Sequence, residues 1–489
     1  MALSGGVQFV AVGPVRSLTA PALRRALGDW RHAGDAYPSL AKAIRMLVLD
    51  GRLPPATRLP SERTLAESLG VSRNTVTAAL DILRRQGYLE SRTGIGTWTT
   101  LPETAAMRPD EILAPAGELL DLTVASLPAP PVLAELAHEA AGELACHLHR
   151  LGYEPFGLPS LRAAVARHLS ERGLPTAADE VLITQGALHG WNLILHALTL
   201  PGDRVLVESP TYPAALDAIA ARRARAVPIP VRAGGWDMDL FHASVRSSGA
   251  RLAYVIPEFQ NPTGVLIDTG QRDELLAAAR AHDVTLVSDE ISIDLALDER
   301  ARPARLAAAT GGSHVVTLGS LSKSCWAGLR TGWIRADRAL IARLGQTRSV
   351  GDVGGPILDG LLAESALRVY DALAADRRTL LAERCDALRA ALARELPEWA
   401  VARPAGGLSL WIELPTPIAS ALAVAALDEG VRIAPGSRFD AAGGLEAHLR
   451  VPFALPPDLL SVAATRLAAA AARVGGVSDR SVRSGGWVL

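Results

Sequence analysis

The chain has 489 residues, a length that fits two to four domains. Its formal net charge of −1 excludes a whole-chain field that would attract a polyanion, so any nucleic-acid binding needs a local basic patch. Its 3 cysteines are widely spaced and form no CxxC pair, which predicts neither a disulfide framework nor a metal site. The sequence shows no signal peptide and no apolar run of membrane-spanning length, so we expect a cytoplasmic protein.

Residues 20–98 are predicted to form a helix-turn-helix followed by a two-stranded wing. Ser61 and Ser72 are good N-caps for two short helices that are separated by a turn at Gly70. Residues 88–98 have glycines at their centre and fit a β-hairpin. The apolar positions expected to face inward are Leu40, Ile44, Leu47, Leu65, Ala66, Leu69, Val76, Leu80 and Leu83.

This segment also carries a local excess of positive charge. Residues 37–98 hold nine Lys or Arg (42, 45, 52, 58, 63, 73, 84, 85, 92) and five Asp or Glu (50, 62, 67, 81, 90). Arg63 and Arg73 fall near helix N-termini, where side chains and backbone N–H groups can bind DNA phosphates. The other candidate DNA contacts are Ser72, Asn74 and Thr75 in the recognition helix and Gly96 in the wing. A small helical domain with a solvated basic face is the alternative.

Residues 99–118 are rich in proline and read as a linker, and the Gly/Ser-rich residues 475–489 read as a flexible tail. Residues 119–474 alternate short apolar strands with alanine-rich helices, a pattern that predicts an α/β fold with a mostly parallel sheet covered on both faces. Ligands of such sheets bind at the carboxyl ends of the strands.

Lys323 is one of only two lysines in the chain, whose Lys and Arg together number 50. Arginine stays protonated, whereas lysine can lose its proton and form a Schiff base with a carbonyl group. Lys323 lies in Ser320-Leu321-Ser322-Lys323 with Arg330 close behind it, which resembles the lysine and phosphate cradle of a pyridoxal 5′-phosphate (PLP) protein. An ordinary surface lysine is the alternative.

The other groups that PLP requires have candidates in order along the chain. A strand followed by Gly186 predicts a helix N-terminus that can bind the phosphate. Asp289 follows a strand and can keep the pyridine nitrogen protonated. Each motif alone is common in turns and helix caps. The full set of candidate cofactor residues is Gly186, Ala187, Leu188, Tyr212, Asn261, Asp289, Ser320, Ser322, Lys323 and Arg330.

Two family resemblances follow from these motifs. Residues 59–63, 65–66, 69–76, 83, 87–89 and 94–97 resemble the winged helix of the GntR superfamily, and residues 119–474 resemble fold-type I aminotransferases. The second resemblance implies that Arg450 binds an effector carboxylate and that Tyr153 reaches the partner's site across a dimer interface. A surface salt bridge is the alternative role for Arg450. The chain departs from the aminotransferase pattern at Ser292, where that family usually has a tyrosine.

Together these parts resemble the MocR/GabR subfamily of transcription regulators: a multidomain protein with a winged helix and an aminotransferase-like domain of large and small subdomains. The resemblance implies binding to double-stranded DNA, a domain-swapped homodimer, and an amino compound or PLP as effector. Two alternatives stay open, an active aminotransferase carrying a DNA-binding domain and a dimerisation domain that has lost its cofactor. Retained Lys323, Asp289 and Arg330 argue against the latter.

Overall fold

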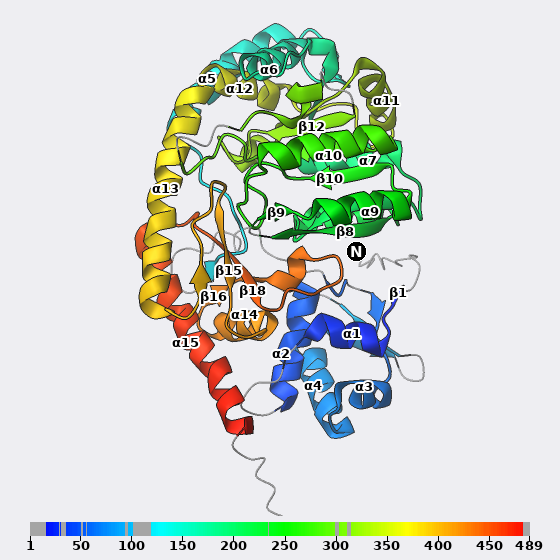
Figure 1. Cartoon of the computed structure of the whole chain (residues 1–489), viewed down its shortest axis with the longest axis vertical. Helices are drawn as coiled ribbons and strands as arrows, with labels where there is room; N and C mark the ends of the chain where they lie inside the picture. Colours follow the sequence, from blue (N-terminus) through cyan, green and yellow to red (C-terminus); the bar gives the residue numbers. More distant parts are fainter. Residues whose placement is uncertain are drawn as a thin grey trace, which may run out of the picture. The chain divides into compact units, whose positions relative to one another are not determined.

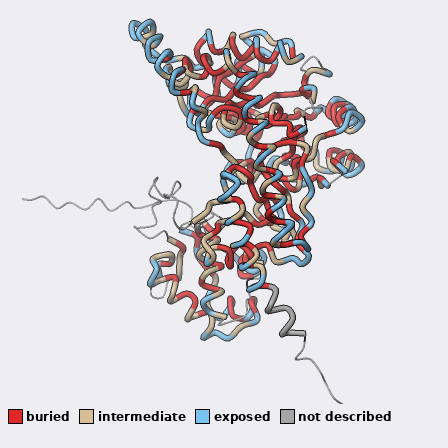
Figure 2. Tube along the Cα trace, turned by 90° about the vertical axis from the view of Figure 1, so that its left-hand side faces the viewer, coloured by how far each residue is buried: buried red, intermediate tan, exposed pale blue. Residues whose placement is uncertain are grey.

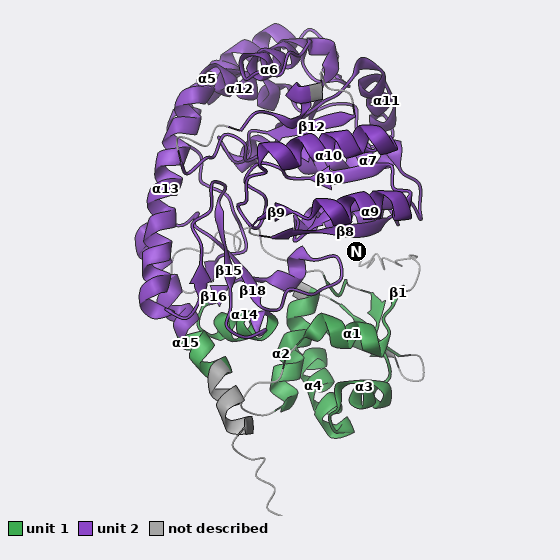
Figure 3. Cartoon of the chain, in the orientation of Figure 1, with its two compact units in different colours: residues 1–119, 420–430, 469–489 green, residues 120–419, 431–468 purple. Residues whose placement is uncertain are grey.

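The computed structural model describes residues 16–28, 30, 36–49, 52–54, 56–92, 96–100, 119–232, 234–298, 303–310 and 314–482. Most of the expected linker and residues 483–489 of the expected tail lie outside these ranges. The chain divides into two compact units (Figure 3): unit 1 comprises residues 1–119, 420–430 and 469–489, and unit 2 comprises residues 120–419 and 431–468. Each unit is described by itself.

Unit 1 contains the predicted helix-turn-helix and wing. Ser61 and Ser72 cap α3 and α4 through their side-chain oxygens, and Gly70 ends α3 in a left-handed conformation with φ 64°. All nine apolar positions expected to face inward are buried, which confirms the predicted helix faces. The elements of unit 1 are β1 (Arg16–Ser17), α1 (Ala20–Leu27), α2 (Ala36–Leu49), β2 (Thr57–Arg58), α3 (Glu62–Leu69), α4 (Arg73–Arg85), β3 (Leu89–Arg92) and β4 (Gly96–Thr99), with the strands in the order β1-β2-β4-β3.

Unit 1 also includes two segments from the C-terminal part of the chain, residues 420–430 and 469–489, which the sequence analysis placed outside the DNA-binding domain. Residues 420–430 belong to it because Val424 of α14 (Ala419–Asp428) shares a buried apolar cluster with helices α1 to α4. The C-terminal helix α15 (Pro457–Val482) keeps a helical backbone eight residues beyond Val474, where we expected the helix to give way to a loose tail.

The eight-stranded sheet of unit 2 is mixed but mostly parallel (Figure 1). Its strands lie in the order β6-β13-β12-β11-β10-β7-β8-β9, and only β13 and β9 run antiparallel to their neighbours. The strands are β6 (Val181–Thr184), β7 (Arg204–Ser209), β8 (Arg225–Arg232), β9 (Gly235–Trp236), β10 (Leu252–Val255), β11 (Thr285–Asp289), β12 (Val315–Ser320) and β13 (Gly332–Arg335).

Helices cover both faces of this sheet, as the unbroken apolar strands predict. Alternate residues of β10 point to different cores: Leu252 and Tyr254 pack in one cluster, and Ala253 and Val255 in the other. Figure 2 shows the buried residues in red along the chain. The first cluster is closed by α7 (Ala187–Leu198), α8 (Pro213–Ala221) and α11 (Arg338–Arg348), and the second by α5 (Val132–Leu144), α6 (Pro159–Glu171), α9 (Met238–Ser248), α10 (Thr269–His282), α12 (Ile357–Arg368) and α13 (Tyr370–Glu395).

Unit 2 also contains a second, smaller sheet. Its order is β14-β15-β18-β17, and β5 pairs in parallel with β16 in a separate two-stranded sheet. These strands are β5 (Leu120–Asp121), β14 (Ala400–Val401), β15 (Ser409–Glu413), β16 (Val431–Arg432), β17 (Ala434–Pro435) and β18 (His448–Pro452). Among the described residues, no helix combines the length and the apolar character that crossing a membrane requires.

Candidate cofactor site and DNA-reading surface

Three of the predicted cofactor residues lie at the carboxyl ends of neighbouring parallel strands. Asp289 is the last residue of β11, Ser320 is the last residue of β12, and Asn261 lies in the turn that follows β10. The register places Asp289 opposite Leu318, two residues before Ser320. The sheet therefore brings together residues that are distant in the sequence, at the edge where ligands of such sheets bind.

Lys323 lies just beyond β12, and its amine faces this group. Its Nζ donates to the carbonyl oxygen of Ala125 at 2.8 Å. Burial and the positive charge of Arg450 lower the pKa of Lys323 to about 8, although the Asp289 carboxylate acts in the opposite direction. A lowered pKa makes the neutral, nucleophilic amine available near neutral pH.

Asp289 is held by a contact that the sequence did not reveal. The Tyr254 hydroxyl, on β10, donates to Asp289 Oδ2 at 2.5 Å, and the Ile291 N–H donates to Oδ1 at 3.2 Å. Burial raises the pKa of Asp289 to about 6, and the Tyr254 hydrogen bond and Lys323 oppose this rise. From the sequence, Tyr254 looks like an apolar residue of a buried strand, and in the structure its ring does pack in a buried cluster. Only the pairing of β10 with β11 brings its hydroxyl to the carboxylate of Asp289.

The expected phosphate end is formed by the start of α7 and by Arg330. Gly186 precedes α7 with φ 87°, a conformation that favours glycine, and a Cβ on it would lie 3.0 Å from Nη2 of Arg330. Arg330 Nη2 donates to the carbonyl of Gln185 at 2.7 Å. Ala187 and Leu188 are the first residues of α7, so their N–H groups have no acceptor within the helix.

The two predicted serines differ in their surroundings. Ser320 Oγ donates to the carbonyl of Thr331 at 2.9 Å and accepts the N–H of Ser322 at 3.2 Å, so it also shapes the turn before Lys323. Ser322 is half-buried. A phosphate contact from either hydroxyl stays a prediction.

Arg450 is buried at 7% exposure, beside the other candidate residues rather than on the surface. Its guanidinium lies 4.9 Å from the centre of the Phe439 ring, and Nη2 donates to the carbonyl of Thr123. Nε has no hydrogen-bond partner among the described residues. Burial lowers the pKa of Arg450 to about 10. This burial disfavours the surface salt-bridge alternative and leaves a cation ready to bind an anionic group.

Tyr212 lies near the same residues, and Tyr153 does not. Burial and the Asp289 carboxylate raise the pKa of Tyr212, while Arg450 and Arg330 act against this rise. Tyr153 has 67% of its surface exposed, which fits a residue with no role in its own chain's site. Ser292 is buried three residues after Asp289, and its carbonyl accepts the N–H of Leu295 at 2.9 Å.

In unit 1 the predicted DNA contacts lie at the start of α4 and around it. Ser72 Oγ accepts the Thr75 N–H at 3.1 Å and lies 2.8 Å from its hydroxyl, so both side chains help to cap the helix. Arg73 and Asn74 are exposed. Arg63 is also exposed and forms an ion pair with Glu67 at 3.1 Å. Gly96 has φ 146°, which lets the wing backbone adopt a conformation that other residues rarely take.

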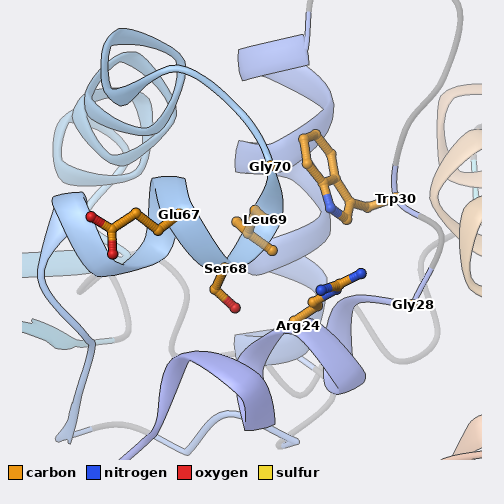
Figure 4. Close-up of a pocket in the computed structure, with 7 residues that line it drawn as sticks. All are labelled: Arg24, Gly28, Trp30, Glu67, Ser68, Leu69 and Gly70. Carbon is orange, nitrogen blue, oxygen red and sulfur yellow. The ribbon is translucent and has the colours of Figure 1, made fainter.

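Two features of unit 1 were missing from the sequence prediction. Glu62 at the start of α3 accepts hydrogen bonds from Thr77 at 2.7 Å and from Arg84 at 3.0 Å, and so joins the two helices of the motif. A hollow of about 390 Å³ lies near α1 and α3, and Figure 4 shows the residues that line it: Arg24, Gly28, Trp30, Glu67, Ser68, Leu69 and Gly70.

Comparisons with known proteins match both units. Residues 36–98 match the gntR family of bacterial regulatory proteins, and residues 117–467 match aminotransferase class I and II. The uncharacterised HTH-type transcriptional regulator YdcR of Escherichia coli is 30% identical over 82% of this chain and 92% of its own length. The probable rhizopine catabolism regulatory protein MocR of Rhizobium meliloti is 30% identical, with 74% and 78% covered.

Among solved structures, LysN, an alpha-aminoadipate aminotransferase of Thermus thermophilus, is 31% identical with a TM-score of 0.68. The match covers 74% of this chain and 93% of LysN, which was crystallised with N-(5′-phosphopyridoxyl)-L-leucine. The fold and the site define an aminotransferase-like domain of fold type I, whose cofactor is PLP, joined to a winged helix. The chain belongs to the MocR-type family of GntR transcription regulators.

The residues present fit PLP. A half-buried amine with a lowered pKa, a buried carboxylate and a glycine turn facing an arginine meet the needs of its aldehyde, ring nitrogen and phosphate. The unpaired Nε of buried Arg450 supplies a donor for a further anionic group. When bound, PLP supplies an electron sink for amino compounds.

Proposed function

We propose that the protein is a DNA-binding transcription regulator that holds PLP on Lys323 and responds there to an amino compound or to PLP itself. The observation that carries this proposal is the half-buried Lys323, whose amine donates to the Ala125 carbonyl beside Asp289 and Arg450 in a chain that also has a winged helix. Such a protein acts in the cytoplasm, where it has access to DNA.

Each candidate residue has a role in this proposal. The N–H groups of Gly186, Ala187 and Leu188 bind the phosphate together with Ser320, Ser322 and Arg330. Tyr212 stacks on the ring, Asn261 donates to its oxygen, and Asp289 holds the proton on its nitrogen. Arg450 binds the carboxylate of the effector where one is present. The winged helix reads DNA with Arg63, Ser72, Arg73, Asn74, Thr75 and Gly96.

Ser292 favours regulation over turnover. An aminotransferase with tyrosine at this position has a phenol beside the cofactor oxygen, and the shorter serine hydroxyl is far less acidic. A bound amino compound is therefore expected to stay on the cofactor rather than to be converted and released. Active transamination by the same site is the second candidate.

A second copy of the chain is part of the proposal. Apolar side chains are exposed on residues 148–153 and 350–353, with Leu151 and Val350 both 92% exposed. The two segments are neighbours, because a Cβ on Gly354 would lie 2.6 Å from the Glu154 carbonyl oxygen. We propose that this patch faces the partner, with Tyr153 reaching the partner's site, and that the winged helix of one copy packs on the other copy's large domain. Sedimentation of a single copy at micromolar concentration would contradict this.

The test uses the scarcity of lysine. The protein is incubated with PLP, reduced with borohydride and mapped by mass spectrometry, with Lys42→Arg as the control variant. We expect the label on Lys323, a visible absorbance band that Lys323→Ala lacks, and DNA binding that changes with an effector only in the protein that carries Lys323. Decay of the band to a pyridoxamine-type spectrum would favour the aminotransferase. A label on Lys42 alone would overturn the proposal.

A further inference from the structure

His189 is a half-buried residue in the first turn of α7 that no step of the proposed function uses. Its Nδ1 accepts the backbone N–H of Gln185 at 3.0 Å. Gln185 immediately precedes Gly186, and its carbonyl accepts the hydrogen bond from Arg330. His189 therefore holds one side of the turn that Arg330 holds from the other.

The second ring nitrogen of His189 is also engaged. Nε2 lies 3.2 Å from Asp352 Oδ2. Because Nδ1 accepts a hydrogen bond, the neutral ring carries its proton on Nε2, where it can donate to this carboxylate. Asp352 thus fixes the tautomer that leaves Nδ1 free to accept.

Asp352 is itself held in place. Its Oδ1 accepts the Gly354 N–H at 2.9 Å and a hydrogen bond from Nε of Arg348. Arg348 is fully buried, and its Nη1 donates to the carbonyls of Ile183 at 2.5 Å and Pro155 at 3.1 Å. Ile183 belongs to β6, the strand that leads into the turn. The chain of contacts begins and ends on the same strand–turn–helix segment.

We propose that His189 is a positioning residue for the phosphate turn: by accepting the Gln185 N–H it fixes the backbone so that the next N–H groups are presented to the cofactor phosphate. This inference rests on the proposed function, because it assumes that the turn binds the phosphate of PLP. The hydrogen bond also takes the Gln185 N–H away from the ligand, which leaves Gly186, Ala187 and Leu188 as donors.

Burial favours the neutral form of the His189 ring. Burial lowers its pKa; Asp352 acts against this, and Arg348 and Arg330 add to it. A protonated ring would carry a hydrogen on Nδ1 and could no longer accept from Gln185. The bond is therefore present at neutral pH and is lost as pH falls through the lowered pKa, below the ordinary histidine range.

Two substitutions distinguish the roles of the two ring nitrogens of His189. In His189→Asn the amide oxygen can take the place of Nδ1, and in His189→Gln the amide can replace Nε2 and reach Asp352 without serving Gln185. We expect His189→Asn to bind PLP within about twofold of the unaltered protein. We expect His189→Gln to bind it about tenfold more weakly, the loss of one hydrogen bond that orders a charged site.

The measurement is the dissociation constant for PLP and for pyridoxal, which lacks the phosphate, by absorbance titration between pH 5 and pH 8. We expect His189→Gln to weaken PLP and leave pyridoxal unchanged, and the unaltered protein to lose PLP affinity in acid relative to His189→Asn, whose amide does not titrate. Thermal unfolding checks that all variants are folded.

Each other result has a distinct meaning. If His189→Gln binds PLP as tightly as the unaltered protein, or loses PLP and pyridoxal equally, the positioning role is wrong while the PLP site stands. If the unaltered protein binds neither compound, the proposed function falls and the inference falls with it.

Discussion

The DNA-reading unit and the cofactor site hold their functional side chains in different ways. At the start of α4, Ser72 is held by Thr75 three residues away, and its neighbours Arg73 and Asn74 are exposed. In the candidate cofactor site, Lys323 is hydrogen-bonded to the carbonyl of Ala125 and Arg450 to that of Thr123, across 198 and 327 residues of sequence. The DNA-reading residues at the start of α4 are held by a single turn of helix. The candidate cofactor site depends on the whole fold of unit 2.

This difference decides what a substitution can do. An exposed side chain on a locally capped helix can be removed at little cost to folding, and only its contact with DNA is lost. A buried cation or carboxylate changes the protonation of its neighbours when it is removed, because charges interact strongly away from water. Substitutions in unit 1 should therefore change affinity alone, and those in the cofactor site should also change pH dependence.

The largest effect is expected for Arg450→Gln. A buried arginine that binds a carboxylate through two hydrogen bonds contributes about 3 kcal/mol, so amino acids should bind about 100-fold more weakly. Amines without a carboxylate should bind as before. Titration of the PLP-loaded protein with an amino acid and with its decarboxylated amine measures both, and Arg450→Lys serves as the variant that keeps the charge. An equal loss for both ligands would mean that Arg450 supports the site without binding the effector.

A smaller effect is expected for Arg73→Ala in unit 1. Removing one phosphate contact should weaken operator binding about tenfold at low salt and reduce the slope of log affinity against log salt by about one. Arg63→Ala is the matched control, because Arg63 is already paired with Glu67 and should lose less. The PLP spectrum should be unchanged in both variants. A shift of that spectrum in either variant would contradict the expectation that substitutions in unit 1 leave the cofactor site unchanged.

The same contrast explains how far the sequence alone could go. Helix caps, turns and apolar faces depend on residues close together in the sequence. The caps Ser61 and Ser72 and the buried faces of α3 and α4 could therefore be predicted from the sequence alone. The order of motifs also assigned Lys323 and Asp289 to one candidate site. Which other groups touch them depends on strand order and register, and no spacing rule predicts either.

Tyr254 and His189 illustrate what was missed. Tyr254 looks like one more apolar residue of a buried strand, and it meets Asp289 only because β10 lies beside β11. His189 sits in an ordinary helix start, and its partner Asp352 comes 163 residues later, after α11. The extra helical turns of α15 were missed because Gly475 and Gly476 read as the start of a loose tail.

The smallest effect expected is a shift in the pH at which Lys323 reacts. Burial lowers the pKa of Lys323 to about 8, so the neutral amine forms above pH 8 instead of near the ordinary value of 10.5. The rate at which the cofactor-free protein captures PLP should rise with pH, pass its midpoint near pH 8 and level off roughly one unit higher. Stopped-flow absorbance measures this rate.

Asp289→Asn then sharpens the comparison, because the carboxylate favours the charged ammonium and so raises the pKa of Lys323. Without that negative charge the ammonium is less stable, and the midpoint of the rate profile should move to lower pH, by up to about one unit. Arg450→Gln should move the midpoint the opposite way, since Arg450 lowers the pKa of Lys323. Arg73→Ala should leave it in place. A midpoint near 10.5 in the unaltered protein would mean that the amine is solvated, and the contrast between an exposed DNA-reading surface and a buried cofactor site would no longer hold.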